Sequence, residues 1–221
     1  MAKTLALIHT TPVLIPGFTD LCKELLSGVA VFNVVDESLI KNTIQAGKLE
    51  KRTIRRLVRL VESAGEAGAE AVLVTCSSIG PAVPVARALF EFPVLRIDEP
   101  MAEEAVRIGQ RIGALATLRT TLDPTVRLLE ETARRQERSR DITASLCEGA
   151  FEAVCAGDAP THDRLVLDKL LDMMQRVDVV VLAQASMARI IPQIPAGTRT
   201  VPILSSPRLA MERVRDTLQG R

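Results

Sequence analysis

The chain has 221 residues, and its 28 Lys and Arg against 27 Asp and Glu give a formal charge of +1 at pH 7. This balance excludes a protein that binds nucleic acid mainly by charge, because such a protein needs a basic excess to displace counterions from phosphates. Hydrophobic residues make up 47% of the chain, enough for a folded core, whereas the 2% of aromatic residues excludes stacking platforms and aromatic cages. We therefore expect a globular protein whose ligand is small and polar.

Short aliphatic runs alternate with longer amphipathic segments, which is typical of strands joined by crossover helices in parallel sheets. The predicted strands cover residues 3–8, 29–35, 71–75, 94–97, 112–116, 142–146, 177–182 and 200–204. The clearest predicted helix covers residues 48–67, where Leu49, Ile54, Leu57, Val58 and Val61 form a hydrophobic stripe. The basic residues around that stripe are interpreted as a solvated outer face.

An internal repeat organises the chain. Residues 70–78 resemble residues 178–186 at an offset of about 108, and residues 7–11 resemble 117–121 at about 110. Residues 92–95, followed by a helix, resemble 201–204, also followed by a helix, at about 109. Because the three segments recur in the same order at nearly the same spacing, the chain is predicted to consist of two similar α/β halves.

The predicted fold is therefore α/β, with two pseudo-symmetric lobes that each contain a mainly parallel sheet flanked by helices. The first lobe is expected to comprise residues 1–98 and the C-terminal helix within 205–221, and the second lobe residues 99–204. In a parallel sheet, the loops that leave the carboxyl ends of the strands form the ligand crevice. We expect the active site in a cleft where the loops after residues 75 and 182 of the two lobes meet.

Cys76 is the leading candidate for a reactive side chain. It ends a buried strand and is expected to open a helix, with Ser77 and Ser78 directly after it. The positive end of a helix dipole favours a thiolate, and the neighbouring amides and hydroxyls can hold an anion. The alternative is that Cys76 is a small buried hydrophobic residue and that the two serines only cap the helix.

The Val-Thr-Cys-Ser-Ser segment around Cys76, the Leu-Ala-Gln-Ala-Ser-Met-Ala segment around Gln184 and the Asn-Val-Val-Asp-Glu-Ser segment that includes Asp36 resemble the aspartate/glutamate/hydantoin racemase superfamily. The resemblance covers nearly the whole chain and implies the two-lobed fold. It also implies that Cys76 corresponds to the first of two catalytic cysteines that flank the substrate's α-carbon. The superfamily also includes maleate isomerase and arylmalonate decarboxylase, so the resemblance is less specific for the reaction.

The second catalytic position departs from the family pattern, because Gln184 stands where the second thiol is expected. An amide has no accessible proton-transfer pKa and cannot act as a general acid or base. Gln184 can still donate its NH₂ group to a carboxylate or an enolate oxygen. By the resemblance, Glu148 corresponds to a pocket glutamate of glutamate racemases and is a candidate replacement for the missing base; a helix-start carboxylate is the alternative.

The remaining candidates are substrate-binding residues at the carboxyl ends of the predicted strands. By the resemblance, Ser77, Ser78 and the loop 117–121 hold carboxylate or enolate oxygens, and Thr10 and Thr11 lie where glutamate racemases place an acidic residue. Turn and cap chemistry is the alternative for Thr10 and Thr11. The complete predicted substrate-binding set is His9, Thr10, Thr11, Asp36, Ser77, Ser78, Thr117, Thr120, Thr121, Ala185 and Ser186.

The two histidines receive different interpretations. His9 ends the first strand and is expected to point toward the cleft, as a proton shuttle or as a hydrogen-bonded structural residue. His162 begins a helix and is interpreted as a surface residue. Asp36, Asp98 and Glu99 follow strands, but no histidine lies nearby in the sequence to complete a typical transition-metal set, so no metal site is predicted.

Neither GxGxxG nor GxxxxGK[ST] occurs, which argues against a nucleotide cofactor, and no cofactor is predicted. The four cysteines form no CxxC pair, and no apolar run is long enough to span a membrane. We expect a cytoplasmic protein with reduced thiols that binds a small carboxylate or amino-acid-like substrate, does not bind nucleic acid or membrane, and forms a homodimer or a higher homo-oligomer by family expectation.

These observations favour a cofactor-independent isomerase of the racemase type that acts at the carbon next to a carboxylate or carbonyl, with Cys76 as the single catalytic thiol. Epimerisation through another base, tautomerisation and cis–trans isomerisation through a thiol adduct are all compatible with a single thiol. One alternative is a lyase, in which decarboxylation leaves an enolate that Cys76 protonates. The other is a non-catalytic binder of small carboxylates.

Overall fold

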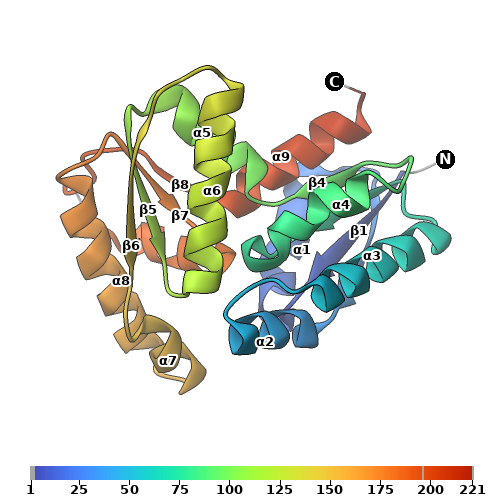
Figure 1. Cartoon of the computed structure of the whole chain (residues 1–221), viewed down its shortest axis with the longest axis horizontal. Coiled ribbons are helices and arrows are strands. Elements are labelled where there is room, and N and C mark those ends of the chain that lie inside the picture. The colour runs from blue at the N-terminus through green and yellow to red at the C-terminus, as the bar shows by residue number, and fades with distance from the viewer. Residues whose placement is uncertain (1–2, 196, 221) are drawn as a thin grey trace. The chain divides into compact units, whose positions relative to one another are not determined.

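The computed structural model describes residues 3–195 and 197–220 and divides the chain into two compact lobes (Figure 1). The first lobe contains the residues up to Ile97 and those from Pro207 on, and the second contains Asp98–Ser206. The sequence had assigned residues 98, 205 and 206 to the first lobe. The contacts of the backbone place these three residues with the second lobe.

The first lobe contains a parallel sheet with the strand order β2-β1-β3-β4. Its strands are β1 (Thr4–His9), β2 (Ala30–Val35), β3 (Ala71–Val74) and β4 (Val94–Arg96). Its helical segments are η1 (Pro12–Leu14), α1 (Ile15–Leu25), α2 (Glu37–Ala46), α3 (Lys51–Glu66), the 3₁₀ helix η2 (Ser77–Ala82), α4 (Val83–Arg87) and α9 (Ser206–Leu218). The helix predicted over 48–67 is thus α3, shortened at both ends.

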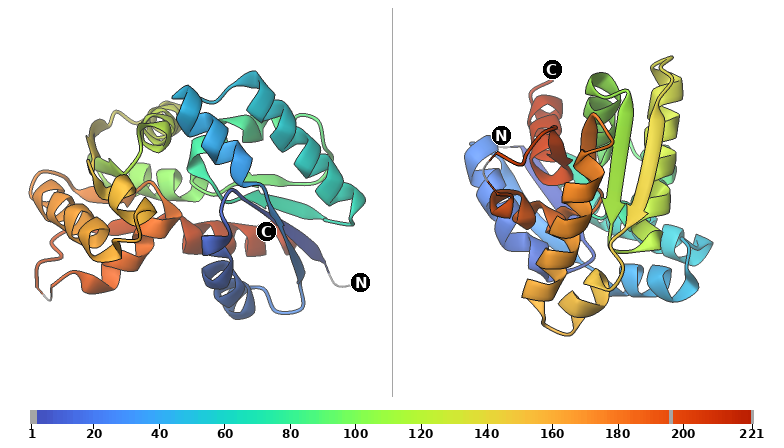
Figure 2. Two further views of the ribbon diagram at one scale, coloured as in Figure 1. Left: turned by 90° about the horizontal axis from the view of Figure 1, so that it is seen from below. Right: turned by 90° about the vertical axis from the view of Figure 1, so that its left-hand side faces the viewer.

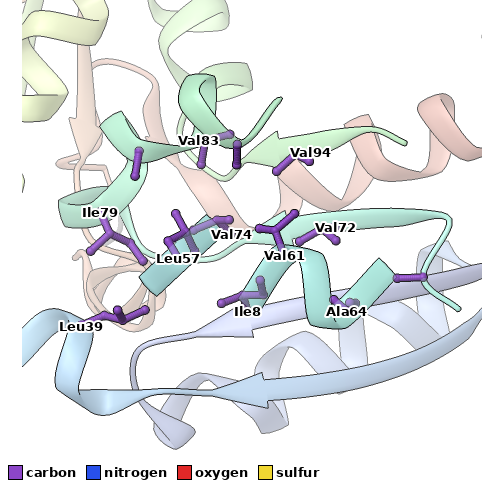
Figure 3. Packing of buried hydrophobic residues seen from close by; sticks show 14 residues of the cluster. Ile8, Leu39, Leu57, Val61, Ala64, Val72, Val74, Ile79, Val83 and Val94 are labelled. Carbon is purple, nitrogen blue, oxygen red and sulfur yellow. The ribbon is translucent and has the colours of Figure 1, made fainter. Parts of the chain in front are cut away.

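Side-chain alternation along the strands gives this sheet two buried faces. Ile8 faces α3, where Leu57 and Val61 sit one turn apart and have no exposed surface (Figure 3). The basic side chains of α3 lie outside this stripe. Phe18 of α1 covers the other face, and Figure 2 shows α1 and α3 on opposite sides of the sheet. Burying each large aliphatic side chain of this kind contributes about 1.5–3 kcal/mol.

The second lobe repeats this plan. Its parallel sheet has the order β6-β5-β7-β8. The strands are β5 (Arg111–Ala116), β6 (Asp141–Leu146), β7 (Val179–Leu182) and β8 (Ile203–Ser205). The helices are α5 (Glu99–Ile108), α6 (Arg119–Arg135), α7 (Ala150–Cys155), α8 (Ala159–Met174) and the 3₁₀ helix η3 (Ala185–Gln193). Leu170 and Met173 of α8 pack on one face of the sheet with Leu115 and Leu182.

The register of the strands confirms the predicted fold class and two of the three repeated segments. Ile8 pairs with Val74 in the first sheet, and Leu115 pairs with Leu182 in the second. Residues 7–11 therefore correspond to residues 114–118, and their predicted alignment with 117–121 was wrong by three residues. All eight predicted strands are present, with ends that differ by up to three residues. Among the described residues, no helix combines the length and the apolar character needed to cross a bilayer.

Candidate active site

The carboxyl ends of the first lobe's strands gather most of its predicted site residues. β1 ends at His9, β2 is followed by Asp36, and β3 is followed by Thr75 and Cys76. The β1–β3 ladder continues past its last pair, because the Thr75 amide donates to the Ile8 carbonyl at 3.0 Å. Extending the register by two residues past the Ile8–Val74 pair places Thr10 beside Cys76.

Cys76 is half-buried and packs against the hydrophobic cluster between the sheet and α3. Its backbone is extended, with φ −127° and ψ 117°, and it precedes η2 rather than an α-helix. The sequence had predicted a longer helix here. Pro81 lies inside η2, and the following α4 has five residues. A short 3₁₀ segment carries a smaller dipole than a full helix, so this segment favours a thiolate less strongly than the sequence suggested.

Three buried hydroxyl residues are close to Cys76 in the sequence or in the strand register. Ser77 and Ser78 are 5% and 2% exposed, and Thr10 is 4% exposed. The structure shows no side-chain cap at the start of η2. Thr11 is the N-cap of η1, where its hydroxyl accepts from the Val13 amide at 3.4 Å. Thr11 therefore has the capping role that was one of its two predicted interpretations.

His9 is fully buried, and both ring nitrogens have partners. Nδ1 lies 2.8 Å from the Thr75 hydroxyl, and Nε2 lies 2.9 Å from Asn33 Oδ1. The ring also meets Phe18 edge-on at 5.5 Å. Burial lowers the pKa of His9, although the hydrogen bond with Asn33 opposes the shift. The structure thus places His9 in the hydrogen-bonded role that was one of its two predicted interpretations.

Asp36 is engaged on both carboxylate oxygens. It caps α2, where Oδ1 accepts from the Ser38 amide at 3.0 Å, and Oδ2 accepts from Arg56 at 2.6 Å. Arg56 also reaches the Ser38 hydroxyl. These contacts anchor the start of α2 to α3. The predicted substrate-binding role of Asp36 would require one of them to open.

In the second lobe, Gln184 occupies the position that Cys76 holds in the first. Extending the β5–β7 register past Leu115 and Leu182 places Gln184 beside Thr117, and the Gln184 Oε1 atom accepts from the Thr117 amide at 2.6 Å and from its hydroxyl at 3.0 Å. A backbone amide can only donate, so this contact fixes the orientation of the Gln184 amide. The Gln184 NH₂ group is therefore turned away from Thr117.

The other predicted residues of the second lobe differ in exposure. Thr121 is 2% exposed and accepts from the Thr125 hydroxyl through its carbonyl, whereas Thr120 is half-buried. Thr120 Oγ1 itself is buried and has no hydrogen-bond partner in the described part of the chain. Ala185 and Ser186 begin η3, and Ser186 is exposed. Glu148 is exposed in the turn between β6 and α7.

A charged cluster that the sequence did not indicate ties η3 to α8. Asp163 accepts from Arg189 at 2.6 Å and from Gln193 at 3.0 Å, and its Oδ1 lies 2.7 Å from Nδ1 of His162. Burial opposes the charge of Asp163, but the hydrogen bonds from Gln193, His162 and Arg189 outweigh it and lower the pKa. His162 is 3% exposed, so its interpretation as a surface residue was wrong: it faces the protein on the fourth residue of α8.

Sequence reasoning also missed Thr75 and Asn33, the two partners of His9. Thr75 ends an aliphatic run and Asn33 interrupts another, and a polar residue at a strand end was the only available signal. The other cysteines lie elsewhere: burial raises the pKa of Cys147 to about 11, with Lys169 opposing, and also raises the pKa of Cys22. Cys22 lines a cavity of about 240 Å³ beside α1, together with Lys23 and Asn33.

The described residues contain no group of three or more His, Cys, Asp or Glu side chains placed to hold a metal ion.

The family model described as Asp/Glu/Hydantoin racemase matches residues 9–214. No curated protein matches the chain at a significant level in sequence. Glutamate racemase from Francisella tularensis, solved with D-glutamate, is similar with a TM-score of 0.76 and 11% identity, covering 99% of this chain and 82% of that chain.

Two further solved structures show the same similarity. A putative Asp/Glu racemase from Yersinia pestis has a TM-score of 0.73 and 18% identity, with coverage of 98% of this chain and 100% of that chain. Allantoin racemase from Klebsiella pneumoniae has a TM-score of 0.71 and 15% identity, with coverage of 98% and 88%. At these identities the similarity establishes the two-lobed α/β fold.

Proposed function

Because the chain belongs to the Asp/Glu/hydantoin racemase family, we propose that it is a cofactor-independent isomerase acting at the carbon next to the carboxylate or carbonyl of a small acid, with Cys76 as its single catalytic thiol. The observation that supports this role is the position of Cys76. It is half-buried at the carboxyl end of β3, among the buried hydroxyl residues Thr10, Ser77 and Ser78. Ligands of parallel α/β sheets bind at this end of the strands.

In the proposed reaction, the Cys76 thiolate removes the proton from the substrate's α-carbon and becomes a thiol. The electron pair of the C–H bond passes into an enolate, and a proton then returns to the same carbon. Hydrogen-bond donors lower the barrier when they are fixed where the enolate charge develops. Thr10, Ser77 and Ser78 are the proposed donors of the first lobe, and the half-buried Cys76 thiolate is the base.

The proposed role of Gln184 is to donate its NH₂ group to an anionic oxygen of the substrate. Thr117 occupies the carbonyl oxygen with two hydrogen bonds, which leaves the NH₂ end of the amide as the group available for a ligand. Thr117 is therefore assigned to orienting Gln184. Thr120, Thr121, Ala185 and Ser186 stay predictions as further substrate-binding residues.

Inversion of configuration needs an acid on the face of the α-carbon opposite the thiol, and Glu148 is the candidate. Removing Glu148 should then separate two observables. Exchange of the α-proton with solvent through Cys76 should persist, while inversion should stop. Glu148→Gln tests this, and Glu152→Gln, an exposed glutamate on neighbouring α7, is the matched control.

The decisive experiment is incubation in D₂O with each enantiomer of glutamate, aspartate and allantoin, the compounds named for similar proteins. NMR and polarimetry should show deuterium at the stereogenic carbon together with loss of optical activity. Cys76→Ala should reduce the exchange by about 10³-fold, the scale of a lost general base. Cys22→Ala, which changes another half-buried cysteine, should leave it unchanged.

Three outcomes would overturn the proposal. Exchange that survives Cys76→Ala would remove the thiol from the mechanism. Release of CO₂ from a dicarboxylic acid would instead identify a lyase, and saturable binding without exchange would identify a binder.

A further inference from the structure

The residues beneath Cys76 form a hydrogen-bonded chain across three neighbouring strands. It runs from Asn33 on β2 through His9 on β1 to Thr75 at the end of β3. The second lobe has no such chain: the corresponding register positions are Ala116 and Ala183, which carry no polar side chain. This hydrogen-bonded chain lies beneath Cys76 and has no counterpart beneath Gln184. Burying polar groups is costly unless all of them are paired, so we look for a role that the chain has in the first lobe alone.

The partners determine where the protons lie. The Thr75 hydroxyl has two acceptors within reach, His9 Nδ1 at 2.8 Å and the Ile8 carbonyl at 3.1 Å, and it donates to Nδ1 when His9 carries its proton on Nε2. His9 Nε2–H then donates to Asn33 Oδ1 at 2.9 Å. The other neutral tautomer would set the bare Nε2 against the Asn33 oxygen, which places two acceptors face to face. With the Asn33 oxygen facing the ring, the Nε2–H tautomer is therefore the neutral form that pairs all three side chains.

This chain fixes the backbone from which Cys76 projects. Thr75 points to the α1 side of the sheet and Cys76 to the α3 side, because successive residues of an extended strand alternate. With its hydroxyl fastened to His9 and its amide to Ile8, Thr75 cannot rotate without breaking buried hydrogen bonds. The direction of the next side chain is then set as well. His9, with no exposed surface, is placed to act on the thiol through Thr75 and not by touching a ligand.

We propose that His9 is a positioning residue: with Asn33 it holds the Thr75 hydroxyl, and this contact fixes the direction in which the Cys76 thiol leaves β3. The proposal deepens the proposed function, since it assumes that Cys76 is the catalytic thiol. It differs from the sequence-based prediction, in which His9 binds the substrate directly.

The proton arrangement is tested first by ¹⁵N NMR of the imidazole rings in the wild-type protein. The chain has only two histidines, so His9→Phe assigns both signals. The expected result at pH 7.5 is a protonated Nε2 and an unprotonated, hydrogen-bonded Nδ1 for His9. An Nδ1–H tautomer, or rapid exchange between the two tautomers, would overturn the proposal.

The positioning role is tested by a matched pair at Thr75. Thr75→Val keeps the shape and removes the hydroxyl, and Thr75→Ser keeps the hydroxyl. Because misplacement of a reacting group lowers the rate of the chemical step, Thr75→Val should lower kcat about 10-fold with KM changed less than about 2-fold, and Thr75→Ser should restore most of kcat. His9→Phe and the double variant His9→Phe/Thr75→Val should lose no more kcat than Thr75→Val alone, because each of the three variants removes the contact between His9 and Thr75.

A second measurement needs no turnover. Alkylation of Cys76 by iodoacetamide, followed at its own peptide by mass spectrometry, should be faster in Thr75→Val than in Thr75→Ser, because a loosened strand end exposes a half-buried thiol more often. Equal alkylation rates and equal kcat values in the two folded variants, with only Tm lowered, would overturn the positioning role. If the wild type shows no turnover, the proposed function fails, and the tautomer and alkylation results still decide this proposal.

Discussion

The edges of the two sheets hold equivalent residues by different contacts. Cys76 and Gln184 both follow the third strand of a parallel sheet with the same strand order. Gln184 is held directly, by two hydrogen bonds from Thr117. Cys76 follows Thr75, whose hydroxyl is hydrogen-bonded to the buried ring of His9. The repeat in the chain thus determines where a side chain stands, and the residues on neighbouring strands determine what that side chain can do.

The difference has a physical reason. An amide carries a strong acceptor, so a neighbouring backbone N–H can fix it by itself. A thiol forms only weak hydrogen bonds, and its direction has to be fixed through the backbone that carries it. The lobe with the thiol therefore needs support under the strand, whereas Ala116 and Ala183 suffice in the other lobe. The four predictions below test this contrast, beginning with the largest expected effect.

The largest effect is expected when the amide of the second lobe becomes a carboxylate. Gln184→Glu preserves the acceptor that Thr117 holds at 2.6 and 3.0 Å, but it removes the NH₂ donor and adds a negative charge. Repulsion of an anionic substrate in a partly buried site should lower kcat/KM about 100-fold. Steady-state kinetics of Gln184→Glu measures this. Activity close to wild type would show that the amide donates nothing to the substrate.

The 3₁₀ helix after Cys76 depends on a close approach to β4. A Cβ atom at Gly80 would lie 2.9 Å from Cζ of the buried Arg96, so Gly80→Ala must displace either the helix or the guanidinium. Overpacking of this kind should lower the free energy of unfolding by about 1–3 kcal/mol. Urea denaturation measures it, with Gly17→Ala as the control, because nothing lies within 4 Å of a Cβ there. Equal stability of both variants would contradict this prediction, because it would mean that η2 or the Arg96 guanidinium shifts without cost.

The 3₁₀ helix after Gln184 is held by charge instead. Asp163→Asn leaves Arg189 and His162 without their carboxylate partner. Because Arg189 is partly exposed, solvent screens part of the loss, and we expect a fall of about 1–2 kcal/mol in the free energy of unfolding. Asp168→Asn, which breaks an exposed pair with Arg164, should cost less than about 0.5 kcal/mol. Similar costs for the two variants would contradict a structural role for the Asp163 cluster.

The strands and most of the repeat could be predicted because short aliphatic runs between amphipathic segments are typical of buried parallel strands. It predicted less about what surrounds each candidate. The burial of His9 depends on Asn33 of β2 and on Thr75 at the end of β3. The burial of His162 depends on η3, whose Arg189 follows His162 by 27 residues in the sequence. The 3₁₀ form of η2 was missed because Pro81 is compatible with the start of an α-helix as well. Contacts between distant segments are not encoded in local patterns.

The smallest expected effect is the pH dependence that His9 adds to stability. Burial lowers the pKa of His9 in the folded protein below its unfolded value of 6.5, so below that pH the unfolded chain binds more protons than the folded one. The free energy of unfolding must then fall as the pH drops from 6.5 toward the lowered pKa. Between pH 7.0 and 5.5 the loss from this one group should be up to about 1 kcal/mol.

Urea denaturation of the wild type and of His9→Phe at these two pH values isolates that contribution, because the two proteins share every other titratable group. The wild type should lose more stability on acidification than the variant does. Thr75→Val should lie nearer to the wild type, since it keeps the buried imidazole. An identical loss in the wild type and in His9→Phe would contradict the prediction, because it would mean that His9 keeps its ordinary pKa although Phe18, Asn33 and Thr75 enclose the ring.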